Sequence, residues 1–364
     1  MKNYTQTLCL VLVLCLALGL TACGTGKTSS PASGTNLSPV SPPSSATSLA
    51  PPPPASGTDL PQPGPDTDLP VNVMVLNGST GFGMAELMSR SENGGAMLNY
   101  SFQVDSDASN VAAALVSGSA DIAALPTNAA ASLYNKTGGA VRLLAINTLG
   151  VLYLVVNGDT ESIGSVADLK GKTVYVPAQN PTFIFRYICQ ANGLDDVVID
   201  NSYAQPADLR TAVAAGEVDI AVLPEPMVTI ALSANDALVS ALDLTREWNA
   251  VAPVADSLVQ GCVVVRSEFA EEHPAEVEAF LDEYARSIAY LGSGADDVGE
   301  MIEAAGIFTN GAVAQKAVPG CNVCFISGAD MVGPMEAFLG IMLELAPDSV
   351  GGRLPGEDFY YPGS

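Results

Sequence analysis

Hydrophobic and polar residues occur in alternating blocks along most of this chain, in the pattern of strands joined to helices. The runs 71–76 and 172–176 are predicted to be strands, and each leads into a polar loop followed by a helical segment. From residue 267 onward, apolar residues recur at the 3.6-residue spacing of a helix. This alternation predicts an α/β fold with mostly parallel sheets flanked by helices.

The pattern G-x-x-D-I-A-x-L-P occurs twice, at residues 118–126 and 216–224. In each copy an alanine-rich helical stretch ends at glycine, and a short apolar strand ends at proline. The repeat predicts two lobes, each with a sheet, and a ligand cleft between them. We expect residues 71–155 and 266–364 to form lobe I and residues 156–265 to form lobe II. The apolar runs 147–156 and 261–266 are predicted to be the two hinge strands.

The start of the chain has a basic residue, an apolar run from Leu8 to Leu20, and small residues before Cys23. This arrangement resembles the lipobox of bacterial lipoproteins, which implies that residues 1–22 are a signal peptide and that Cys23 carries lipid, palmitate among its acyl chains. The alternative is an ordinary secretory signal. The run is shorter than the about 20 residues that span a bilayer. The protein is therefore expected outside the cytoplasm, anchored to the bacterial cell membrane through Cys23.

Residues 23–70 are rich in Pro, Ser and Gly, and Gly24 to Pro70 contain no aromatic residue. Such a segment buries too little apolar surface to offset its ordering entropy. Its prolines favour extended polyproline II conformations. We therefore predict a disordered tether between the lipidated cysteine and the globular body.

The composition excludes several functions. With 39 acidic against 14 basic residues and a net charge of −25, nucleic acid is not an expected partner. The chain has one histidine and no nucleophile–base motif, which disfavours an enzyme. We predict no cofactor and no metal. Cys321 and Cys324 are interpreted as structural thiols or one local disulfide, and redox or zinc chemistry is disfavoured by their strand-like context.

Two further residues have open interpretations. Asn322, between the two cysteines, follows a turn and is a weaker candidate for lining the cleft. Trp248 either packs at a lobe edge or stacks on a ligand ring. The redox states of Cys189 and Cys262 are left open.

Three ordered motifs indicate a family. They are S-V-A-D-L-K-G-K at 165–172, the two repeats, and F-A-E-E-H-P at 269–274. Together the motifs resemble those of type 2 periplasmic solute-binding proteins of ABC importers, in the branch that binds nitrate, sulfonates, taurine and thiamine precursors. The resemblance implies a monomer whose lobes close on one small solute and deliver it to a permease driven by an ATPase. A tethered sensor with a signalling partner, or an enzyme on the same scaffold, are the alternatives.

The resemblance also implies which residues contact the solute, since the family's cleft is built by loops that follow strands. The expected ligand-binding residues are Ser79, Thr80, Gly81, Thr127, Asn128, Gln179, Asn180, Thr182, Glu225 and, more weakly, Tyr153. The alternative for most of them is a helix cap or a turn. Neutral donors near helix starts suit a sulfonate or another compact anion. Glu225 instead favours an amine, as in a thiamine-type pyrimidine, so both ligand classes stay open.

Overall fold

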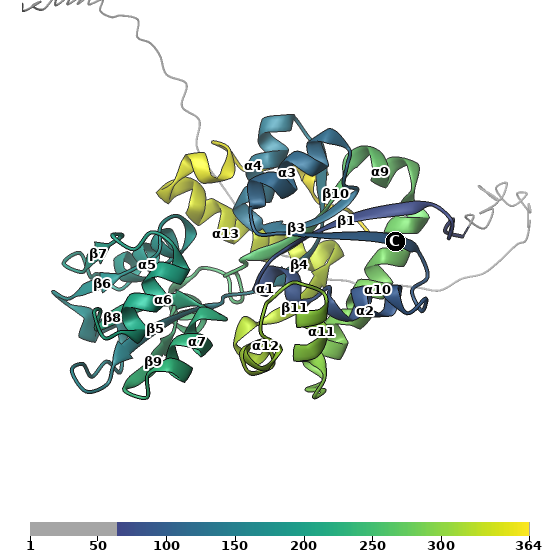
Figure 1. Ribbon diagram of the computed structural model, residues 1–364. Coiled ribbons are helices and arrows are strands. Elements are labelled where there is room, and N and C mark those ends of the chain that lie inside the picture. Colours follow the sequence, from purple (N-terminus) through teal and green to yellow (C-terminus); the bar gives the residue numbers. More distant parts are fainter. Residues whose placement is uncertain (1–63, 364) are drawn as a thin grey trace, which may run out of the picture. The chain divides into compact units, whose positions relative to one another are not determined.

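The computed structural model describes residues 64–363, whose strands form two separate sheets (Figure 1). The six-stranded sheet, with its helices, is called lobe I here, and has the strand order β11-β4-β10-β3-β1-β2. Its strands are β1 (Pro70–Leu76), β2 (Asn99–Asp105), β3 (Ile122–Pro126), β4 (Val141–Thr148), β10 (Gly261–Arg266) and β11 (Val323–Ser327). The predicted mixed α/β fold with two helix-flanked sheets is confirmed.

The five-stranded sheet, with its helices, is called lobe II and has the order β7-β6-β8-β5-β9. Its strands are β5 (Leu152–Asn157), β6 (Thr173–Tyr175), β7 (Val198–Asp200), β8 (Ile220–Pro224) and β9 (Leu238–Asp243). In lobe I, β1, β2 and β3 run parallel, β10 runs antiparallel to both β3 and β4, and β11 runs antiparallel to β4. In lobe II, β6, β7 and β8 run parallel, and β5 runs antiparallel to both β8 and β9.

The helices alternate with these strands along the chain. They are α1 (Ser79–Phe82), α2 (Ala85–Glu92), α3 (Ala108–Ser117), α4 (Thr127–Thr137), α5 (Asn180–Ala191), α6 (Pro206–Ala214), α7 (Met227–Ala234), α8 (Leu244–Val251), α9 (Ser267–Glu272), α10 (Pro274–Gly292), α11 (Val298–Ala304), α12 (Gly311–Ala317) and α13 (Val332–Leu345). Five 3₁₀ turns complete the described part: η1 (Val166–Leu169), η2 (Val318–Cys321), η3 (Gly328–Met331), η4 (Pro347–Val350) and η5 (Glu357–Phe359). No helix of residues 64–363 has the length and apolarity that a membrane crossing requires.

The repeated motif produces the same local structure in each lobe. Gly118 and Gly216 follow α3 and α6 with φ near 75° and 73°, a left-handed conformation that glycine adopts without steric cost. The strands β3 and β8 come next; each has four buried residues followed by a half-buried proline. The internal repeat therefore corresponds to one helix–turn–strand unit per lobe.

The lobe boundaries differ from the expected ones by several residues. β5 belongs wholly to the sheet of lobe II from Leu152, and β10 belongs to lobe I, where it lies between β3 and β4. The segments that cross between lobes are consequently 149–151 and 258–260, not the apolar strands at 147–156 and 261–266. Buried strands of the two sheets have similar compositions, so the composition of β5 and β10 did not reveal which sheet each strand joins.

The ordered body also begins earlier than residue 71. The backbone N–H of Asp66 donates to Glu276 Oε1 at 2.7 Å, and Pro70 already pairs with Asn99 in the sheet. The end of the expected tether, residues 64–70, is thus part of the fold. The signal peptide, Cys23 and residues 24–63 lie outside the described residues.

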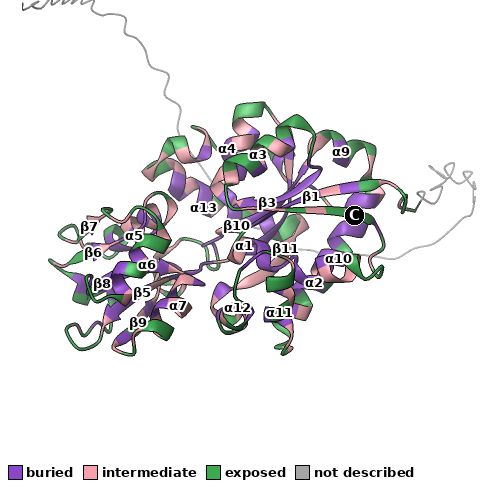
Figure 2. Ribbon diagram, in the orientation of Figure 1, coloured by how far each residue is buried: buried purple, intermediate pink, exposed green. Residues whose placement is uncertain are grey.

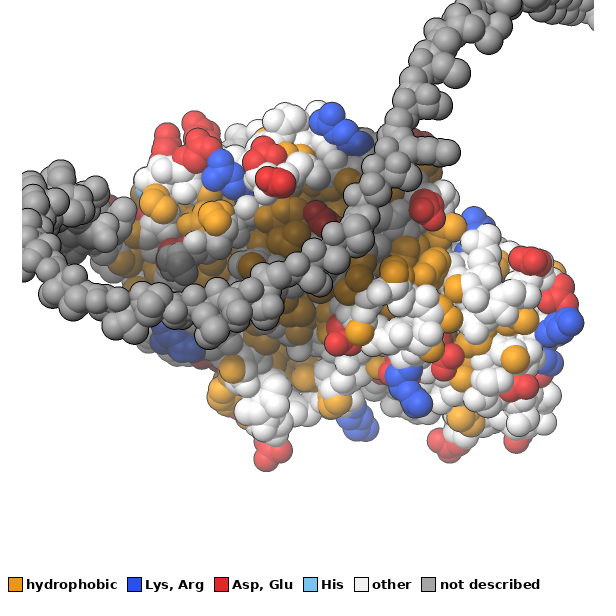
Figure 3. Space-filling view, turned by 180° about the vertical axis from the view of Figure 1, so that it is seen from behind, with side chains coloured by type: hydrophobic (Ala, Val, Ile, Leu, Met, Phe, Trp, Pro, Cys, Tyr) orange, Lys and Arg blue, Asp and Glu red, His pale blue; other side chains and the backbone are white. Residues whose placement is uncertain are grey.

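Alternating side chains of each strand face two helical layers, as the pleat requires. Val73 and Val75 of β1 pack in a cluster with α2, α10 and α11, while Met74 and Leu76 pack in a second cluster with α3 and α4. Figure 2 shows buried residues along the strands and exposed ones on the outer helix faces. Figure 3 shows charged side chains dispersed around a hollow in which hydrophobic ones gather.

The second of these clusters, which we call the shared cluster, continues into lobe II. It includes Leu154 and Val222 of the five-stranded sheet, and Phe338 of α13. Trp248 of α8 is fully buried in it, with ring centroids 4.6 Å from Tyr187 and 5.9 Å from Phe338. Its indole N–H donates to Ser257 Oγ at 3.0 Å. Trp248 is therefore a packing residue at a lobe edge, and α13 joins the two lobes through apolar contacts.

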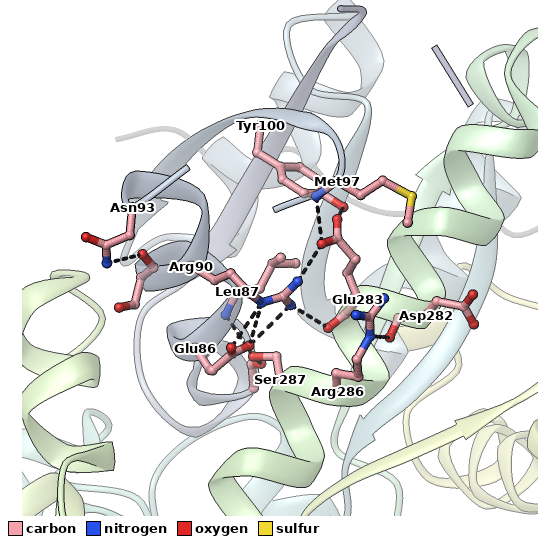
Figure 4. A network of polar contacts seen from close by, with 12 residues as sticks. Glu86, Leu87, Arg90, Asn93, Met97, Tyr100, Asp282, Glu283, Arg286 and Ser287 are labelled. Atoms are coloured by element: carbon pink, nitrogen blue, oxygen red, sulfur yellow. Dashed lines mark hydrogen bonds and ion pairs between the residues drawn. The ribbon is translucent and has the colours of Figure 1, made fainter. Parts of the chain in front are cut away.

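Lobe I contains a buried ion-pair network centred on Glu283 of α10 (Figure 4). The carboxylate, 1 % exposed, accepts hydrogen bonds from Arg90 Nη1 at 2.5 Å, from the Met97 N–H at 2.9 Å and from Tyr100 Oη at 2.9 Å. Arg90 also pairs with Glu86 on its own helix. These bonds join α2, β2 and α10, and satisfy a charge that would otherwise be costly to bury.

We expect Glu283→Gln to lower the free energy of unfolding by about 3 kcal/mol, because Arg90 loses a buried counter-charge and the amide NH₂ cannot accept the hydrogen bond that Tyr100 donates to the carboxylate. Urea unfolding followed by circular dichroism measures this loss. Asp282→Asn is the matched control, since Asp282 lies on the same helix but is exposed. Equal stability of the two variants would show that the network contributes nothing.

Candidate functional site

The ends of strands from both lobes meet at one junction. In lobe I the carboxyl ends of β1, β3 and β4 lead to Thr80, Asn128 and Thr148, and in lobe II those of β6 and β8 lead to Asn180 and Glu225. Open α/β sheets bind ligands off the carboxyl ends of their strands. The junction is therefore the candidate binding site.

The two crossing segments form one wall of this junction, and Gln260 ties them together. Its side-chain Oε1 accepts from the Val151 N–H at 2.8 Å, and its own N–H donates to Thr148 O at 2.9 Å. The Thr127 N–H donates to Gln260 O at 3.3 Å. One residue thus connects both crossing segments and the start of α4.

The predicted loop Ser79–Gly81 forms the single helical turn α1. Gly81 packs so closely that a Cβ atom would lie 2.1 Å from Leu76 O, which explains the glycine. Thr80 O accepts from Asn147 Nδ2 at 2.9 Å, so the backbone of this turn is held by a buried asparagine. Ser79 and Thr80 remain half-buried.

Thr127 and Asn128 differ in what they face. The Thr127 hydroxyl is fully buried and donates to Val259 O at 2.7 Å, so it stabilises the crossing segment. Asn128 Oδ1 accepts from Asn180 Nδ2 of lobe II at 2.7 Å, and its own Nδ2 makes a long 3.5 Å contact with Ser349 O. Asn128 therefore bridges the lobes.

The lobe II loop also divides into structural and junction residues. Thr182 is buried, with its hydroxyl donating to Pro177 O at 2.8 Å and accepting from Asn201 Nδ2 at 2.7 Å. Gln179 is exposed and has a positive φ of 70°. Asn180 begins α5 and is paired with Asn128 through Nδ2, while its buried Oδ1 has no hydrogen-bond partner among the described residues.

Glu225 and Tyr153 lie against Gly320 of lobe I. Tyr153 Oη donates to Gly320 O at 2.9 Å, and a Cβ at Gly320 would meet Glu225 Oε1 at 3.1 Å and Tyr153 Oη at 3.3 Å. The Glu225 carboxylate accepts from the N–H and the hydroxyl of Thr229, at 3.1 and 3.0 Å. Burial raises its pKa, and the Thr229 hydrogen bonds act in the opposite direction. Burial, and the charges of Asp243 and Glu225, raise the pKa of Tyr153.

Asn322 lies at the junction, but its polar groups hold the crossing segment. Its Nδ2 donates to Gly150 O at 2.5 Å, and its backbone O accepts from the Leu149 N–H at 3.1 Å. Cys321 and Cys324 on either side of it are free thiols, and burial raises the pKa of Cys324 to about 12. A thiol that stays protonated is a poor nucleophile.

The sequence did not indicate several residues that the fold places at the junction. Asn147 is buried between Thr80 and Tyr284, and donates to Tyr284 Oη at 2.9 Å. Gly320 and Ser349 come from the C-terminal third, which has no repeat to predict its position. The only signal was the turn-forming Pro319–Gly320 pair.

Other parts of the described chain are poorer candidates. A cavity of about 570 Å³ lies along α10, lined among others by Met97, Pro274 and Tyr361. It adjoins residues before β1, at the amino end of that strand, where α/β sheets do not place ligands. Within residues 64–363, no group of three or more His, Cys, Asp or Glu side chains is arranged to hold a metal.

Solved structures define the class of protein. An ABC transporter from Parabacteroides distasonis matches with 26% identity and a TM-score of 0.68, covering 81% of this chain and 99% of its own. The periplasmic aliphatic sulphonate binding protein SsuA from Escherichia coli matches with 16% identity and a TM-score of 0.64, covering 81% and 92%. The Candida albicans CA3427 gene product, described as having the generic periplasmic binding protein fold, matches with 12% identity, a TM-score of 0.54, and coverage of 81% and 97%. The fold is that of the type 2 periplasmic binding proteins.

The family follows from the sequence comparison. A family model described as NMT1/THI5 like matches residues 96–293, more than half of the chain, and the chain belongs to this family. No curated protein sequence matches it. The resemblance inferred from the motifs is confirmed in its family and its fold.

We expect Gly320→Ala to separate the lobes on the side of Glu225, because the new methyl group meets Glu225 and Tyr153 at contact distances that require a shift. Overpacking of this kind costs about 1–3 kcal/mol. Small-angle scattering should show a larger radius of gyration, and urea unfolding a lower stability. In the control Gly340→Ala, on α13, the methyl meets no atom within 4 Å. Identical scattering curves for both variants would contradict the close contact.

The buried carboxyl predicts a pH dependence. Because the pKa of Glu225 is raised in the folded protein above its ordinary value of 4.5, the stability that it contributes is present below pH 4.5 and is lost as pH rises through the raised value. Glu225→Gln should therefore unfold at a higher temperature than the wild type at pH 7, with the gap closing towards pH 4. Thermal unfolding between pH 4 and 8 measures it, with the exposed Glu217→Gln as control. A gap independent of pH would refute the assignment.

Proposed function

We propose that this chain is the membrane-tethered, extracytoplasmic substrate-binding protein of an ABC importer, which captures a small organic solute between its lobes and delivers it to a permease. The observation that carries the proposal is the direct polar contact between strand ends of the two lobes, Asn128 with Asn180 and Tyr153 with Gly320. Loops that follow strands in both lobes supply these groups, as a ligand-closed cleft requires.

The connections between lobes suit a hinge. Two short segments, 149–151 and 258–260, cross between the sheets, and their φ and ψ angles can change without disturbing either sheet. We propose that the solute replaces or extends the polar contacts of Asn128, Asn180 and Glu225, so that binding favours the closed arrangement. Each of these side chains has a group at the junction that a solute can reach when the lobes part.

Anchoring and delivery complete the proposal. The lipobox-like sequence before Cys23 supports attachment to the bacterial cell membrane by lipid, and the fold class supports a permease and its ATPase as partners. The candidate solutes are a sulfonate or taurine-like compound, suggested by the sulphonate-binding neighbour, and an amino-heterocycle such as a thiamine-type pyrimidine. We propose a monomer that docks on the permease.

The first test is native mass spectrometry of the full chain purified from cells that make it, followed by denaturation to release any bound small molecule. A stoichiometric adduct that also raises the unfolding temperature supports solute capture. If no adduct appears, and no fraction of a small-molecule extract from these cells or their growth medium stabilises the chain, the binding function is wrong.

The recovered solute allows a test of the site. We expect Asn128→Ala to weaken its binding about tenfold, because a hydrogen bond across the junction is lost and Asn180 is left unpaired, a cost of about 1.4 kcal/mol. Calorimetric titration gives the affinity. Asn93→Ala, at the exposed end of α2, is the matched control. Unchanged affinity in Asn128→Ala would move the site away from this pair.

A further inference from the structure

On the lobe II side of the junction, neighbouring strands each end at, or lead to, a residue that can accept a hydrogen bond. β6, β8, β5 and β9 are neighbours, and the residues at their junction ends are Asn180, Glu225, Tyr153 and Asp243. Neighbouring strands are about 4.8 Å apart, so the strand ends that carry or lead to these groups form a row. The strand that leads to Glu225, β8, lies between β6, which leads to Asn180, and β5, which carries Tyr153.

Two carboxylates in this row have no cationic partner. Glu225 accepts only from Thr229 among the described residues, and neither it nor Asp243 takes part in an ion pair there. Asp243 is paired in register with Tyr153, and its carboxylate caps α8 by accepting from the Thr245 N–H at 2.9 Å. Both charges also raise the pKa of Tyr153.

Unpaired polar atoms also occur among residues that contact the junction. Asn180 Oδ1, Thr245 Oγ1 and Ser349 Oγ are buried and have no hydrogen-bond partner within the described chain. An amide oxygen only accepts, and leaving one buried and unpaired costs about 1–3 kcal/mol. Asn180 and Ser349 both contact Asn128, so two of the three atoms belong to one cluster that spans the lobes. The Asn180 amide oxygen therefore lacks a donor, whereas the two hydroxyls could either donate or accept.

Positive charge is absent from the junction residues of the described chain. None of the residues placed at the strand ends is Lys, Arg or His; the nearest cations along the sequence, Arg246, Lys316 and Arg353, are exposed, and Arg186, six residues after Asn180 on α5, is half-buried. A sulfonate placed here would face two carboxylates without a counter-charge. A protonated amine or an amidinium-like group would instead gain charge-assisted hydrogen bonds, which are about twice as strong as neutral ones.

We propose that the solute is a cation or an amine-bearing compound, and that Glu225 and Asn180 Oδ1 accept hydrogen bonds from its N–H groups, with Asp243 supplying further negative charge. The proposal rests on the proposed binding function and assigns its ligand class. Ser349, from the C-terminal turn η4, completes this subsite from lobe I. Specificity then differs from that of a sulphonate-binding protein although the fold is shared.

The test divides a small-molecule extract of the producing cells and their medium by ion exchange into a cationic pool and an anionic pool. Each pool is added to the full chain, and thermal unfolding and native mass spectrometry report binding. Butylammonium and butanesulfonate, which have equal carbon chains and opposite charge, are probed in parallel. We expect stabilisation and an adduct from the cationic pool.

Single substitutions at the junction test which side chains contact the solute. Glu225→Gln should weaken binding of the cationic solute at least tenfold while raising the unfolding temperature of the free protein at pH 7, and Asn180→Ala should weaken it less. Glu217→Gln, an exposed carboxylate of lobe II, should bind as the wild type does. Unchanged affinity in Glu225→Gln overturns the assignment.

The remaining outcomes separate the two levels of the proposal. Binding from the anionic pool alone, or of butanesulfonate in preference to butylammonium, overturns the ligand class and leaves solute capture standing. Binding from neither pool overturns the inferred ligand class, and if the uncharged flow-through also fails to bind, solute capture is overturned as well.

Discussion

The shared hydrophobic cluster is the constraint on which the rest of this structure depends. It runs from the α3 and α4 face of lobe I to the α5 and α8 face of lobe II, and Phe338 of α13 packs within it. Large buried aromatic contacts resist separation, so this side of the junction holds the lobes together. On the other side the lobes meet through α7 and α12, and through the smaller contacts at Gly320. The apolar contact between the lobes is therefore concentrated away from Glu225.

Polar groups at the junction fall into two kinds. Those of Thr127, Thr182, Asn147 and Gln260 are satisfied by the protein itself, and they hold strand ends and crossing segments in place. Those of Asn180, Glu225 and Ser349 retain unused acceptors or an uncompensated charge. A protein keeps such groups buried only where something offsets their cost. The division separates the residues that hold the junction together from those that retain an unpaired atom or an uncompensated charge.

Much of the fold followed from local patterns, because a repeated helix–turn–strand unit leaves the same signature at Gly118 and Gly216. The sheet to which β10 belongs did not follow from local patterns, because the valines of β10 suit any buried strand. For Thr127 and Thr182, the sequence located the strand end but not the direction of the hydroxyl. The Thr127 hydroxyl is directed by Val259 O, far along the chain, and the Thr182 hydroxyl by Pro177 O in its own loop. Ser349 lies more than two hundred residues from Asn128, and a contact over that distance is decided by tertiary packing alone.

Trp248 is the only tryptophan of the chain, and it lies where α8 of lobe II meets α13. Its indole stays out of water, between Tyr187 and Phe338, with its N–H bonded to Ser257 beside a crossing segment. A loss of the contact between α8 and α13 would change the polarity and quenching that this one fluorophore experiences. The indole emission thus reports, without labels, whether this contact between the lobes is intact.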